Sequence, residues 1–177
     1  KVGYNHKIYP AMLETMDLAI ARVLGELERL KIEEETFVVF TSDNGPFGGV
    51  GDARPLRGDK GHLYEGGIRV PTIMRWPAKI TRNSKLKVGS STDLLVDCSD
   101  LLPTFCELAD APVPLGLSGV SIAPTLTGEG EQRIREFLIH EAGGQASIIR
   151  GRHKLIRSRG IAKPSQTGAK NKKRPKK

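Results

Sequence analysis

The side chains best suited to chemistry follow an apolar run in the first third of the chain. Asp43 and Asn44 come directly after this run, Phe-Val-Val-Phe at residues 37–40, and Lys60 lies on a glycine-flanked loop further on. Four apolar residues bounded by turn formers predict a buried strand over residues 37–42. In an open α/β sheet, ligands bind just beyond the carboxyl ends of strands. Oxygen donors at that point suit a divalent cation such as calcium, and Lys60 would return a positive charge to the same place.

A structural interpretation of the same residues stays open at this stage. Asp-Asn-Gly-Pro at residues 43–46 also makes a good tight turn, because Asn and Gly tolerate left-handed backbone and Asp bonds its own backbone. His6 is expected to be a solvated side chain and not a catalytic one. Arg57 and Arg69 are expected to hold the loop by pairing with an acid (Asp52, Asp59 or Glu65).

Hydrophobic periodicity places the elements that would position this turn. Residues 10–30 predict an amphipathic helix with an inward face made of Met16, Ile20, Val23, Leu27 and Leu30. Residues 70–76 form a second apolar run, where a proline favours an edge strand or a strand start. Residues 93–109 predict a short entry followed by a helix that Asp97 or Ser99 would cap, with inward Leu101, Leu102, Phe105, Cys106 and Leu108. A short helix at 122–126, a strand at 136–141 and a hairpin around Gly151 complete the expected order.

Composition separates a globular body from a basic end. The 177 residues are 38% hydrophobic and carry a net charge of +8. Twelve Lys or Arg and no acids fall within residues 150–177, which leaves 16 basic and 20 acidic residues, a net of −4, in the remainder. No stretch is long and apolar enough for a membrane span. Cys98 and Cys106 are two helical turns apart, too far for a disulfide with each other, and are expected to be small buried side chains.

Two motifs in this order resemble the sulfatase family. They are FTSDNG at residues 40–45 and LRGDKGHLYEGGIRVPTIMRWP at residues 56–77. The resemblance extends from about Tyr9 to about Ser158 and points to an arylsulfatase-like member of the alkaline phosphatase superfamily. It implies that Asp43 and Asn44 are calcium ligands and that Lys60 contacts the sulfate, as a catalytic and substrate-binding residue. Asp59 departs from the family pattern, which commonly has a small residue there, and an acid beside Lys60 would weaken anion affinity.

The resemblance also implies a fold and an organisation. The expected class is α/β: the C-terminal part of a sulfatase-like mixed sheet flanked by helices, with a small C-terminal antiparallel hairpin. Residues 1–110 would belong to the catalytic domain, 111–160 to a small C-terminal subdomain, and 161–177 to a disordered basic tail. Formylglycine in sulfatases arises from a Cys/Ser-x-Pro/Ala-x-Arg motif, which neither cysteine matches. The chain is therefore expected to be a C-terminal portion that lacks the nucleophile and hydrolyses no sulfate ester alone.

The implied function is calcium-dependent hydrolysis of sulfate monoesters, with a sulfated small molecule or glycan as the partner. Two other functions are considered beside it: a related metal-dependent phosphoesterase, and a non-catalytic fragment whose basic tail binds polyanions. No specific nucleic-acid binding is expected, because no nucleic-acid-binding motif precedes the tail and no aromatic residue interrupts it. A full-length family member would be periplasmic or secreted, while the sequence leaves the compartment, the ester and the oligomeric state open.

Overall fold

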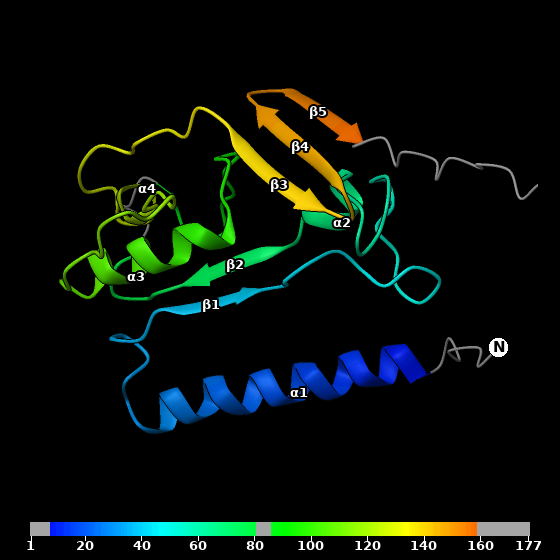
Figure 1. Cartoon of the computed structure of the whole chain (residues 1–177). Helices are drawn as coiled ribbons and strands as arrows, with labels where there is room; N and C mark the ends of the chain where they lie inside the picture. The colour runs from blue at the N-terminus through cyan, green and yellow to red at the C-terminus, as the bar shows by residue number, and fades with distance from the viewer. Residues whose placement is uncertain (1–7, 81–85, 159–177) are drawn as a thin grey trace, which may run out of the picture.

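The computed structural model describes residues 8–80 and 86–158. A long helix, α1 (Ile8–Arg29), leads into strand β1 (Val38–Thr41), a one-turn helix α2 (Glu65–Ile68) and strand β2 (Thr72–Arg75). A second group of elements follows, namely α3 (Leu101–Leu108), α4 (Ala123–Thr127), β3 (Leu138–Ala142), β4 (Gln145–Arg150) and β5 (His153–Ser158) (Figure 1). The predicted α/β class is confirmed. The proposed division at residues 110 and 160 stays a prediction, and both His6 and residues 161–177 lie outside the described residues.

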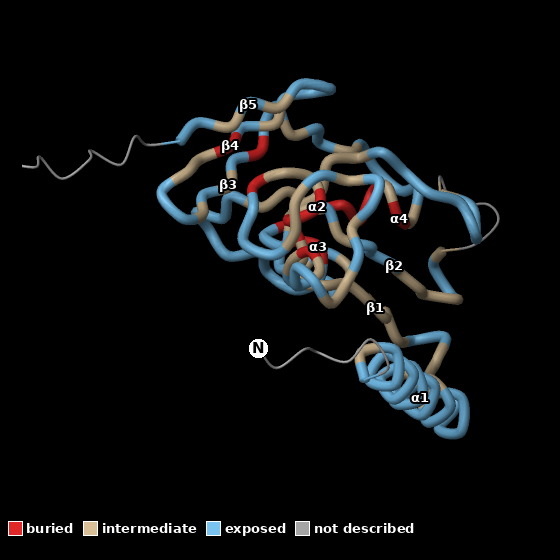
Figure 2. The backbone as a smooth tube through the Cα atoms, turned by 90° about the vertical axis from the view of Figure 1, so that its right-hand side faces the viewer, coloured by how far each residue is buried: buried red, intermediate tan, exposed pale blue. Residues whose placement is uncertain are grey.

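Helix α1 forms where periodicity predicts it, but its apolar face is not buried. It contains no buried residue, and Val23 on the expected inward face is 60% exposed. Ile20 and Leu27 are only half-buried. In Figures 1 and 2 the helix lies beside β1, apart from the rest of the chain. The predicted burial is wrong because periodicity fixes which side chains share a face, whereas burial needs a second surface against that face. No helix in the described ranges is long and apolar enough to cross a bilayer.

Strands β1 and β2 pair antiparallel, with Thr41 opposite Thr72 and their hydroxyls 2.9 Å apart. The two strands form a sheet of their own within the described residues. Consequently the residues of β1 are half-buried, and the prediction of a fully buried strand is wrong. Just before β1, Phe37 packs on Trp76 and meets Phe105 of α3 edge-on, with ring centroids 5.6 and 5.9 Å apart. These aromatic contacts attach the sheet to the C-terminal half.

Helix α3 follows the short entry that the sequence predicts. Residues 93–97 are not helical, and Asp97, one of the two predicted caps, caps a short 3₁₀ turn (Cys98–Asp100) that leads into the helix. The predicted inward face is wrong in part, since Leu102 and Phe105 are exposed, whereas Pro103 and Thr104 are buried. The Thr104 hydroxyl explains this orientation, because it donates to the carbonyl of residue 100 (2.6 Å) and accepts from the amide of residue 122 (3.0 Å), next to α4.

The two cysteines are free thiols, as the helical spacing predicts. Cys106 is half-buried in α3, but Cys98 is exposed. The expectation of a buried Cys98 is therefore wrong. The reason is that Cys98 belongs to the 3₁₀ turn at the surface and not to the helix that would have turned it inward.

The C-terminal strands form a three-stranded antiparallel sheet in the order β3-β4-β5. Two-residue turns join them: Gly143 and Gly144 both have positive φ, and Gly151 has φ of 55° at the first position of the second turn. Such turns match the twist of the strands they connect. The hairpin predicted around Gly151 is present, and the Gly-Gly turn adds β3 as its third strand.

Candidate active-site loop

The predicted metal ligands lie where β1 ends. Strand β1 stops at Thr41, and the Ser42 hydroxyl donates to the carbonyl of Asn44 at 2.9 Å, which closes the turn. Asn44 is half-buried and Asp43 is exposed. No described residue donates a hydrogen bond to the Asp43 carboxylate, which is therefore not used within its own turn. We call residues 43–46 the Asp-Asn turn.

The structure brings Lys60 to this turn through the backbone. Its amide donates to the carbonyl of Pro46 at 2.9 Å. The side chain of Lys60 is exposed, at the tip of a loop that runs from residue 57 to residue 64 and then enters α2. We call residues 57–64 the Lys60 loop. A second backbone bond, from Gly45 to the carbonyl of Gly67 (2.8 Å), joins the Asp-Asn turn to α2.

Three glycines permit these contacts because each lies where a side chain has no room. A Cβ on Gly45 would lie 1.8 Å from the carbonyl oxygen of Gly66. A Cβ on Gly66 would lie 2.2 Å from the carbonyl oxygen of Gly58, and one on Gly67 would lie 2.0 Å from that of His62. Since the opposing atoms are backbone, they cannot move aside as a flexible side chain would. The turn, the loop and α2 are thus packed as one unit.

The acids of this region take partners other than those predicted. Arg54 binds Asp52, and their side-chain and backbone hydrogen bonds lower the pKa of that carboxyl to about 2. Asp59 lies 2.6 Å from Nδ1 of His62, and Glu65 binds Lys154 at 2.8 Å. The guanidinium of Arg57 instead lies over the ring of Tyr64, 3.9 Å from its centroid. The predicted pairing of Arg57 and Arg69 with these acids is therefore wrong.

The Asp59–His62 contact bears on the departure from the family pattern. The second carboxylate oxygen of Asp59 packs on Gly48, where a Cβ would come within 2.1 Å of it. Asp59 is thus held between a histidine and a glycine. A carboxylate with a partner of its own competes less for the neighbouring lysine ammonium, so an acid at this position is compatible with anion binding by Lys60.

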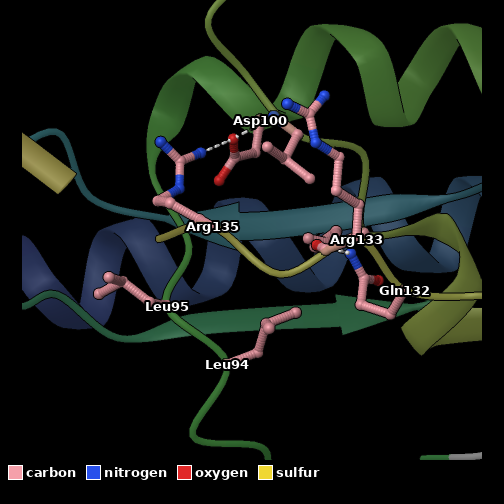
Figure 3. A pocket seen from close by; sticks show the side chains of 8 residues that line it. Leu94, Leu95, Asp100, Gln132, Arg133 and Arg135 are labelled. Atoms are coloured by element: carbon pink, nitrogen blue, oxygen red, sulfur yellow. Dashed lines mark hydrogen bonds and ion pairs between the residues drawn. The ribbon is translucent and has the colours of Figure 1, made fainter. Parts of the chain in front are cut away.

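Two hollows occur elsewhere in the described structure, and neither includes the Asp-Asn turn or the Lys60 loop. The first is a cavity of about 10 Å³ beside the buried ion pair of Asp100 and Arg135 (Figure 3). Leu94 and Leu95 line its other side. Its volume suits a single water molecule and excludes a substrate. The second is a larger hollow of about 300 Å³ between α3 and α4.

The buried pair in Figure 3 is structural. The Asp100 carboxylate, 1% exposed, also accepts the amides of Asp97 (2.8 Å) and Val120 (2.6 Å). A buried charge is tolerated when a countercharge and hydrogen bonds surround it, as here. Residues 97–100 are thereby fixed to the segment that leads into β3. Asp97 in turn lies 3.4 Å from Nε2 of His140 on that strand.

The donors fit calcium in type but not in number. Over the described residues, no group of three or more His, Cys, Asp or Glu could hold a metal ion. Asp43 and Asn44 offer one carboxylate and one amide oxygen, whereas calcium takes six to eight oxygens. These two side chains can therefore form one side of a calcium site, with other oxygens or water on the remaining sides.

Sequence reasoning identified Asp43, Asn44 and Lys60 but missed their support. The contacts of Gly45, Gly66 and Gly67 have no signature beyond the Gly-Gly pair. The Glu65–Lys154 pair joins residues 89 positions apart, and no local pattern reports such a distance. Lys154 is half-buried in the structure and therefore needs a partner, but in the sequence it lies among His153, Arg152 and Arg157 and does not stand out.

Comparison with known proteins agrees with the resemblance noted in the sequence. The sequence model of the family described as Sulfatase matches residues 5–111. The human steryl-sulfatase is 31% identical over 157 residues, covering 82% of this chain and 26% of that protein. The family match and this relative are consistent with the class of proteins that forms the alkaline phosphatase superfamily. Within that class, the chain belongs to the sulfatase family.

Solved structures show the same fold. A protein solved in complex with its substrate D-glucosamine-2-N,6-O-disulfate has a TM-score of 0.65 and 28% identity, covering 81% of this chain and 29% of that one. A phosphonate monoester hydrolase from Silicibacter pomeroyi has a TM-score of 0.64 at 23% identity, covering 80% of this chain and 30% of that one, and shares the fold alone. The chain spans about a quarter to a third of the length of these proteins.

Proposed function

We propose that this chain is the C-terminal portion of a calcium-dependent sulfatase of the formylglycine type. In this proposal Asp43 and Asn44 are metal ligands and Lys60 is the catalytic contact to the sulfate. The observation that carries it is the hydrogen bond from the Lys60 amide to the Pro46 carbonyl, at 2.9 Å. That bond holds the lysine loop on the turn with the two oxygen donors. The family membership supports sulfate as the anion.

Each group has a distinct chemical role. Calcium, when bound, would supply positive charge that polarises a sulfate oxygen. Asp43 and Asn44 would hold it at the end of β1. The Lys60 ammonium would bind another sulfate oxygen and stabilise the negative charge that develops as the ester bond breaks. The glycine contacts fix the distance between turn and loop, which matters because electrostatic stabilisation requires charged groups held in place beforehand.

The nucleophile is proposed to lie outside this sequence. Cys98 is followed by Ser-Asp-Leu-Leu and Cys106 by Glu-Leu-Ala-Asp, so neither stands in a Cys-x-Pro/Ala-x-Arg motif. The chain alone should therefore hydrolyse no sulfate ester, even with excess calcium. The substrate class is a sulfated small molecule or sugar, supported by the disulfated glucosamine bound by the structural relative.

The test uses the product of the complete reading frame that encodes this chain. We expect turnover of an aryl sulfate, loss of turnover with a calcium chelator, and little activity on an aryl phosphate. Lys60→Ala should lower kcat roughly 10²- to 10³-fold, the range for removing one group that stabilises transition-state charge. Asp43→Asn should raise the calcium concentration needed for half-maximal activity.

Matched controls are available elsewhere in the chain. Lys79→Ala and Asp93→Asn remove exposed side chains of the same types outside the turn and the loop, and both should leave activity unchanged. Preference for the aryl phosphate would replace the sulfatase proposal with the phosphoesterase alternative. Turnover by the chain alone that disappears in Lys60→Ala would show that a different nucleophile is present in this sequence.

A further inference from the structure

The Lys60 loop depends on a contact from the far end of the chain. Glu65, the first residue of α2, accepts a hydrogen bond from the Lys154 ammonium at 2.8 Å. Lys154 lies on β5, where its Cα pairs with Ile149, and its side chain is 17% exposed against 40% for Glu65. It is therefore the more buried partner. Among the described ion pairs, this one alone joins α2 to the sheet of β3, β4 and β5.

Glu65 is next to the two glycines on which the Lys60 loop rests. Gly66 donates its amide to the carbonyl of Arg57 at 2.7 Å, and Gly67 packs on the carbonyls of Asp59 and His62. These contacts between α2 and the loop come from the two residues that follow Glu65. A force that holds Glu65 in place holds the residues on both sides of Lys60 as well.

We propose that Lys154 is a positioning residue that holds the Lys60 loop through Glu65. The proposal rests on the proposed function, in which Lys60 contacts the sulfate. It adds that the C-terminal sheet, which lies beyond the family match at residues 5–111, is part of the support of the site. The half-buried ammonium of Lys154 bonds the Glu65 carboxylate, and a charge-assisted bond of this kind is stronger than one between neutral groups.

The first test measures the loop itself and needs no activity. Hydrogen exchange of the whole chain should be followed by mass spectrometry in peptides that cover residues 57–67. Lys154→Met should raise exchange there about tenfold, because the bond to a charged group is lost. Lys154→Arg should restore most of the protection, since it keeps the charge and a donor. Glu65→Gln should give the same rise from the other side.

A matched control lies on the same hairpin. Arg150 binds Glu136 at 2.8 Å, but both side chains are exposed, at 72% and 67%. Arg150→Met should leave exchange in residues 57–67 unchanged. Unchanged exchange in both Lys154→Met and Glu65→Gln would overturn the proposal. A rise that extends equally over β1 and α3 would also overturn it, because Lys154 would then support the fold at large.

The second test separates positioning from general stability. In the active product of the complete reading frame, Lys154→Met should lower kcat/KM about tenfold. It should lower it little further in a Lys60→Ala background, because residues that act through one another are not additive. Additive losses would overturn the positioning role. Absence of any sulfatase activity would refute the proposed function. The exchange result would then decide alone whether Lys154 holds the Lys60 loop through Glu65.

Discussion

Replacing Gly45 by alanine should separate the two halves of the candidate site. Gly45 is not among the glycines with positive φ, so alanine can adopt its backbone conformation. The cost therefore comes from the new Cβ, which would lie 1.8 Å from the carbonyl oxygen of Gly66 and 2.8 Å from the carbonyl carbon of the same residue. Overpacking of this kind costs about 1–3 kcal/mol. Displacement also weakens the bond from Gly45 to Gly67 (2.8 Å), worth about 1 kcal/mol. We expect Gly45→Ala to lower the free energy of unfolding by about 2–4 kcal/mol.

Gly25→Ala is the matched substitution with the opposite sign. Gly25 lies within α1, and an added Cβ would meet no atom within 4 Å. Alanine is the better helix former by about 1 kcal/mol, so this variant should gain up to that amount. Urea unfolding followed by the fluorescence of the single tryptophan, Trp76, measures both variants. A loss below about 0.5 kcal/mol in Gly45→Ala would refute the packed turn and loop.

Two further predictions concern the segment around α3. Arg135→Met should cost about 3–5 kcal/mol of unfolding free energy, because it leaves the Asp100 carboxylate, 1% exposed, without its countercharge; urea midpoints measure it, and a loss as small as that of Arg150→Met would contradict it. Burial raises the pKa of Asp97, but hydrogen bonds from Ser99 and the charges of His140 and Arg135 outweigh it, so the pKa lies below its ordinary 3.8. Because the pKa of Asp97 is depressed in the folded state, its carboxylate contributes to the free energy of unfolding above pH 3.8. That contribution is lost as the pH falls through the pKa of the folded state. The stability difference between wild type and Asp97→Asn should therefore shrink from pH 6 to pH 3 in urea titrations, and a difference independent of pH would contradict the assignment.

Local pattern was sufficient for most elements. The 3.6-residue period predicted α1, and short apolar runs bounded by turn residues predicted β1, β2 and the last hairpin. These signals succeed because each element is decided by neighbours in the chain. The entry into α3 was predicted as well, because Asp97, one of the two candidate caps, caps the 3₁₀ turn at residues 98–100 that leads into the helix. Gly143 and Gly144 also carry a sequence signal for a two-residue turn, since glycine accepts the positive φ that both positions have.

Burial and long-range pairing were not readable in the same way. The apolar periodicity of α1 predicted which side chains share a face of the helix. Two members of that face, Met16 and Val23, are nevertheless exposed in the described structure. Asp100 meets Arg135 and Glu65 meets Lys154 across 35 and 89 positions, so their pairing follows from the folded topology alone. For the candidate site, the residue types and the strand-end position came from sequence. The glycine contacts that bring turn and loop together came from the structure.

The turns of the C-terminal sheet set an order for folding. A loop of two residues joins the paired strands β3 and β4. In the β1–β2 pair, the residues at the two ends of the connecting loop are Thr41 and Thr72, which are 31 positions apart. Loop-closure entropy makes the second closure costlier by about 2 kcal/mol. The C-terminal sheet should therefore be complete before β1 meets β2, with Lys154 in place when α2 arrives. In pulse-labelled refolding, amides of β4 should gain protection ahead of those of β2, and the reverse order would exclude this sequence of events.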